Sequence, residues 1–196
     1  MENKLEYWRN QTLVNRTSTN TTVAVEYYTL AKFIMNNYKD RMETIQNPLL
    51  HIISHCLELA LKEVIIFAIN NNYIDKQRNT IIHEHNLEKL VEILLSIFHK
   101  ISIENCCSLE DKNLFSNKIP TKFNRIVDIL KTETTTYRYA EKLDKQGKTI
   151  GKGHPFMNDG ESANILELKN LFEDCYSAIC YTDYVLNYMF PEQKIE

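Results

Sequence analysis

Two apolar segments joined by a polar connector, between Leu49 and Lys100, constrain this chain more than any other feature. In both segments the apolar residues recur at steps of three and four, which is the period of one face of an α-helix. These faces carry Leu50, Ile53, Leu57, Leu61, Val64 and Ile65 in the first segment, and Leu87, Leu90, Val91, Leu94, Leu95 and Phe98 in the second. The connector, NNNYIDKQRNTIIHE, has the composition of a loop. Its length lets us expect two antiparallel helices that bury their apolar faces against each other.

The rest of the chain favours an all-α fold, because helix breakers are scarce. All four glycines fall between Gly147 and Gly160. We therefore predict a single domain over residues 1–196, a bundle of about five to six helices with a small β-hairpin or ordered loop near 134–155. Further helices are expected over about 22–45, with a break at Asn47 and Pro48, over 121–132 and over 161–190. The first of these should carry, on or near one face, Val25, Tyr28, Leu30, Ala31, Phe33, Ile34 and Tyr38.

A polar stripe runs along the first central helix, because His51, His55, Glu58 and Lys62 also recur at helical steps. Two histidines four residues apart could hold a metal ion, but no third ligand accompanies them, so we expect no metal site. Glu58 and Lys62 have the spacing of an intrahelical ion pair. With His85, this stripe can converge across the helix pair. Such a cluster would either fix the register of the helices, which we favour, or line a small anion-binding groove.

The central pair resembles the HEPN superfamily of α-helical bundle domains. The matching residues are His55-Cys-Leu-Glu58-Leu-Ala-Leu-Lys62 and His85-Asn86-Leu87-Glu-Lys-Leu90. Arg138-Tyr139-Ala140, followed by Asp144 and Gly147, is similar to an Arg-Tyr-Pro…Asp…Gly segment of some members, with Ala140 in place of proline. The resemblance covers about 100 residues of the printed sequence, 49–147, and implies a HEPN-like helical bundle.

The resemblance implies two alternative functions. Many members are metal-independent endoribonucleases of toxin, antiphage or RNA-processing systems, with an arginine followed by four to six residues and a histidine. Arg78 stands in this relation to His83 and to His85. A histidine can transfer the proton of the 2′-hydroxyl, and an arginine can stabilise the charge on phosphorus. In active members, however, the motif lies in a later helix. We therefore expect first a non-catalytic binding or assembly module, and an endoribonuclease as the alternative.

The charge pattern predicts how such a module would bind RNA or a nucleotide. A net charge of -3 gives no global attraction for nucleic acid, so binding needs a local basic patch. The glycine-containing segment concentrates Arg138, Lys142, Lys145, Lys148, Lys152 and His154. We expect no cofactor, a homodimer formed through a helix face, and a protein partner in a bacterial defence, stress or toxin system. Five cysteines, the absence of a signal-peptide pattern and the absence of a long apolar stretch predict a cytoplasmic protein away from the membrane.

Overall fold

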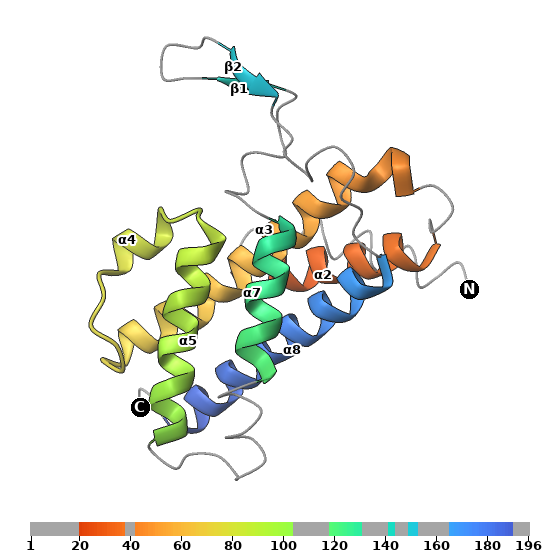
Figure 1. The fold of residues 1–196 in the computed structure, drawn as a ribbon. Helices are drawn as coiled ribbons and strands as arrows, with labels where there is room; N and C mark the ends of the chain where they lie inside the picture. The colour runs from red at the N-terminus through yellow and green to blue at the C-terminus, as the bar shows by residue number, and fades with distance from the viewer. Residues whose placement is uncertain are drawn as a thin grey trace, which may run out of the picture.

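The computed structural model describes residues 20–37, 42–103, 118–130, 141–143, 149–152 and 165–189, and it is an all-α bundle, as predicted (Figure 1). The described residues form six helices and one pair of short strands. The helices are α2 (Asn20–Asn37), α3 (Met42–Asn70), α4 (Arg78–Ile82), α5 (Leu87–Ile103), α7 (Ile119–Leu130) and α8 (Ile165–Met189). The sequence also predicts a short helix over residues 5–13 and a segment capped by Ser108, and both lie outside these ranges, as does Tyr38 of the helix expected over 22–45.

The first helix boundary was predicted wrongly. We expected one helix over 22–45, but α2 ends at Asn37 and α3 already begins at Met42, so that Pro48 lies inside α3. The side chain of Asn37 donates a hydrogen bond to the carbonyl of Phe33, and this kind of local bond disfavours helix continuation. Pro48 removes one backbone donor, and α3 continues because the side chains that follow, beginning with Leu49 and Leu50, are buried.

The buried face of α2 also differs from the prediction. Val25, Leu30 and Phe33 are 45 to 55% exposed, whereas Ala31, as predicted, and also Ala24 and Met35 are at most 1% exposed. The apolar residues of α2 occur on several sides of the helix, so their spacing alone does not define one face. The small side chains of Ala24 and Ala31 define the buried face, because they let α2 approach α3 closely. The thiol of Cys56 on α3 donates to the carbonyl of Ala24 at 3.2 Å.

The central helices α3 and α5 run parallel, and the expected antiparallel arrangement is wrong. His85, just before α5, contacts Glu58, and Lys100 near the end of α5 donates to the carbonyl of Tyr73. Glu58 and Tyr73 are fifteen residues apart, and so are His85 and Lys100, so the two contacts advance along both segments in the same direction. The connector has room for this topology because it folds back along α3 and contains the short helix α4 (Figure 1).

A left-handed residue ends α3 and starts this connector. Asn72 has φ of 56°. The backbone N–H of Tyr73 donates to Ala68, and that of Asn72 donates to Ile69, which is the pattern of a Schellman motif. Tyr73 is buried, and the ammonium of Lys100 lies 4.1 Å from the centre of its ring. The start of the connector is thus anchored to both central helices.

Helices α7 and α8 complete the core. Contacts of Lys122 with Asp174 and of Arg125 with Glu167 show that they are antiparallel. Phe123 of α7 and Phe172 of α8 are fully buried, and Phe123 packs against Phe98 of α5. The prediction of helices over 121–132 and 161–190 agrees with α7, which begins two residues earlier, and with α8, and the expected residues 131–132, 161–164 and 190 lie outside the described ranges.

Two short strands lie apart from the helices in Figure 1. Strands β1 (Glu141–Leu143) and β2 (Thr149–Lys152) pair antiparallel, with Glu141 opposite Lys152 and a shift in register after Lys142. They fall in the span 134–155, and residues 144–148 between them are outside the described ranges.

None of the helices in the described part of the chain is long and apolar enough to cross a membrane.

Candidate polar site at the junction of α3 and the connector

A buried ion pair lies at the centre of the polar stripe on α3. Glu58 is 1% exposed and Lys62 is 4% exposed, although charged side chains are seldom buried without a partner. The ammonium of Lys62 lies 2.7 Å from Oε1 of Glu58. Lys62 also donates to the backbone carbonyl of Ile82, at 3.0 Å. This lysine therefore neutralises Glu58 and attaches the end of α4 to α3.

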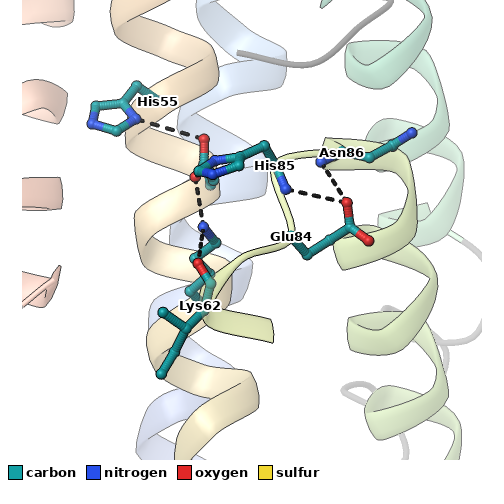
Figure 2. Close-up of polar contacts among 7 residues, drawn as sticks. His55, Lys62, Glu84, His85 and Asn86 are labelled. Carbon is teal, nitrogen blue, oxygen red and sulfur yellow. Dashed lines mark hydrogen bonds and ion pairs between the residues drawn. The ribbon is translucent and has the colours of Figure 1, made fainter. Parts of the chain in front are cut away.

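His85 completes the junction from the connector (Figure 2). Its Nδ1 lies 2.9 Å from the same carboxylate oxygen, Oε1 of Glu58. An ionised carboxylate only accepts hydrogen bonds, so this contact requires the proton on Nδ1. The side chain of His85 is nevertheless 52% exposed. Nδ1 is thus hydrogen-bonded to the buried carboxylate of Glu58, and Nε2 is the ring nitrogen that remains for a ligand.

The backbone on both sides of His85 is also fixed. Oε1 of Glu84 accepts the N–H groups of His85 at 3.1 Å and of Asn86 at 2.9 Å. Burial disfavours the ionised form of Glu84, but these bonds and the ammonium of Lys89 outweigh it and lower the pKa of the carboxyl below its ordinary value. The side chain of Asn86 accepts the N–H of Lys89 and so caps α5. The turn that carries His85 is therefore held independently of its ring.

The histidines of the stripe extend the site toward α2. Nδ1 of His55 is 3.6 Å from Oε2 of Glu58, which suits an ion pair when the ring is charged. At that distance it has no hydrogen-bond partner among the described residues. The ring of His55 packs edge-on against Tyr27, with centroids 4.9 Å apart, and stacks on His51 at 5.9 Å. The described residues contain no group of three side chains that could hold a metal ion.

The predicted convergence of His55, Glu58, Lys62 and His85 is therefore present, and the structure adds residues that sequence reasoning missed. Glu84 and Asn86 position the turn, and Tyr27 covers His55. The hydroxyl of Ser54, one helical turn before Glu58, is buried without a hydrogen-bond partner in the described residues. Only the pair of polar residues Glu84 and Asn86 ahead of an apolar helix offered a signal, as a helix-start pattern.

The arginine–histidine motif is placed on the surface. Arg78 is the first residue of α4, His83 follows its last residue, and both are exposed. Within the described part of the chain, no hydrogen bond or ion pair joins Arg78 to His83 or to His85. The whole of α4 buries only Ile81. These side chains are consequently available to solvent from one short element.

Most of the predicted basic patch lies outside the residues that the structure describes. Arg138 and Lys148 lie outside the described residues. The backbone of Lys152 is part of β2, and its side chain is not described. The structure therefore brings together His51, His55, Glu58 and Lys62 of α3 with His85 of the connector, whereas Arg78 and His83 are exposed elsewhere on the connector.

Comparison of the chain with protein-family models, curated proteins and solved structures finds no match. The HEPN resemblance consequently rests on the short motifs, and function must be argued from the geometry of the site.

Proposed function

We propose that the chain is a cytoplasmic, HEPN-like helical module that binds RNA or a nucleotide through its phosphate groups, without cleaving it. The supporting observation is His85, whose ring is half exposed although its Nδ1 is held by the buried carboxylate of Glu58. A ring fixed in this way loses little conformational entropy when a ligand binds to its other nitrogen. The proposed module acts in a bacterial defence or stress system.

Two further exposed side chains support a phosphate ligand. Arg78 and His83 lie within eight residues of His85, on the same connector. Arginine presents a planar set of donors that suits phosphate oxygens. Because the whole chain carries a charge of -3, binding would depend on these local groups and would weaken as salt rises.

The test is the affinity for a fluorescently labelled single-stranded RNA, measured by anisotropy at several salt concentrations. Replacing Arg78 by alanine should weaken binding about fivefold and reduce the salt slope by about one, as expected for one lost phosphate contact. Arg125→Ala removes the same charge from the pair between α7 and α8 and serves as the control. Equal effects of the two substitutions, or no binding by the wild type, would reject the proposal.

An endoribonuclease is the second candidate, and the pairing of His85 with Glu58 favours it. A carboxylate that fixes the tautomer of an imidazole is a common arrangement for proton transfer. In such an enzyme, His83 or His85 would accept the proton of a 2′-hydroxyl, and Arg78 would stabilise the charge on phosphorus. RNA cleavage by the wild type, abolished in His83→Ala or His85→Ala, would establish this activity and replace the binding-only function. Growth arrest on expression would follow the same variants.

The proposed module is a homodimer that works with a protein partner. Tyr184 on α8 is 66% exposed and stacks on Tyr181, and exposed aromatic side chains are frequent in subunit interfaces. Light scattering after size exclusion should give twice the chain mass. Tyr184→Ser should shift the equilibrium toward the monomer, and a monomeric wild type would reject this part of the proposal.

A further inference from the structure

Proton exchange at His85 is confined by its surroundings to a single atom. A neutral imidazole that donates from Nδ1 has a lone pair on Nε2, and the charged ring donates from both nitrogens. The contact with Oε1 of Glu58, at 2.9 Å, is satisfied in both states. The ring therefore has no reason to turn when it takes up a proton, and the change of charge is felt at Nε2.

The charged groups around this ring come from each neighbouring element. On α3, the ammonium of Lys62 neutralises the carboxylate of Glu58, and Nδ1 of His55 is 3.6 Å from the other oxygen, Oε2, of that carboxylate. From the connector, the carboxylate of Glu84 binds the backbone N–H of His85, and Lys89 of α5 lies 3.3 Å from that carboxylate. Tyr27 of α2 faces His55. Each described carboxylate next to His85 thus has its own lysine.

From this geometry we infer that His85 is a proton-gated contact for a phosphodiester, which it binds as the imidazolium through Nε2–H and releases as the neutral ring. The neutral ring turns a lone pair toward the ligand, and a phosphate oxygen offers only lone pairs in return. The inference rests on the proposed function for its biological ligand. It goes further by naming the ligand group, the binding atom and the control by pH.

Affinity across the histidine titration range tests this gate. The probe is an oligouridylate with a dye that does not respond to pH, studied at constant salt between about pH 5.5 and 8. As the pH rises through this range, wild-type affinity should fall by up to about tenfold per pH unit, which is the limit for one linked proton. His85→Ala should remove this dependence and match the wild type at high pH. His99→Ala, which changes an exposed histidine near the end of α5, should keep it.

A second probe separates failure of the gate from failure of the proposed function. Dimethyl phosphate carries the same phosphodiester without bases, and the imidazole NMR signals of His85 report its binding. If RNA does not bind but dimethyl phosphate shifts these signals only at low pH, the RNA function is wrong and the gate stands. If RNA binds with the same pH profile in wild type and His85→Ala, the gate is wrong. Absence of both responses overturns the two together.

Discussion

Replacing Lys62 by methionine should lower the free energy of unfolding by about 3 kcal/mol, near the lower end of the range for breaking a buried ion pair. Methionine has nearly the same length, so the loss is mainly electrostatic. Glu58, at 1% exposure, would lose the ammonium that now lies 2.7 Å away and neutralises it in the interior. His85 remains on the same carboxylate and limits the cost. The carbonyl of Ile82 also loses its donor, but that residue is 40% exposed and water can replace it.

Urea denaturation followed by circular dichroism measures this loss, and a double-mutant cycle with Glu58→Gln isolates the pair. Because each single substitution leaves one partner unmatched, the double variant should be more stable than the sum of the two losses by at least about 1.5 kcal/mol. Lys32→Met is the matched control, since the side chains of its ion pair with Glu173 are 39% and 30% exposed and the pair should contribute less than about 1 kcal/mol. A loss at Lys62 no larger than at Lys32, or strict additivity in the cycle, would refute the reasoning.

Three other predictions concern the connector and the core. Glu84→Gln should destabilise the protein by about 1 kcal/mol at neutral pH. Because folding lowers the pKa of this carboxyl, its contribution is present above the unfolded value and disappears as the pH falls through the folded value, so denaturation curves of the two proteins should converge in acid. Asn72→Ala should cost about 1 kcal/mol in thermal unfolding and Asn72→Gly should not, because residue 72 has positive φ; equal effects would contradict the left-handed helix end. Burial raises the pKa of the Cys56 and Cys175 thiols, so peptide mapping should find them alkylated only after unfolding, and rapid native labelling would contradict their burial.

Sequence periodicity predicted the central helices well because their apolar residues occupy a single face. Leu57 and Leu61 of α3 and Leu90 and Leu94 of α5 are all at most 1% exposed. The same reasoning failed for α2, where apolar side chains occur on several sides and small residues determine the contact. It also failed for the direction of α5, because a connector of this composition can either turn sharply or return along α3. The contact of Lys100 with Tyr73, made between distant residues, decides between these two paths.

The polar site was predictable where helical spacing places residues together, and only there. Glu58 and Lys62 are neighbours on one helix, so their pairing follows from the period. The contact of His85 with Glu58 was only one of several contacts that the sequence allowed between the two central helices. Glu84 acts through backbone groups of the turn, and the sequence indicates it only as part of a helix-start pattern, without its bonds to His85 and Asn86.

The central claim is that Glu58 holds Nδ1 of His85 and leaves Nε2 for a ligand. Long-range ¹H–¹⁵N spectra of protein labelled at histidine test it directly, with the signals of residue 85 identified by their loss in His85→Gln. The structure predicts that the neutral ring carries its proton on Nδ1. A neutral ring protonated on Nε2, the form that free histidine prefers in water, would contradict the claim.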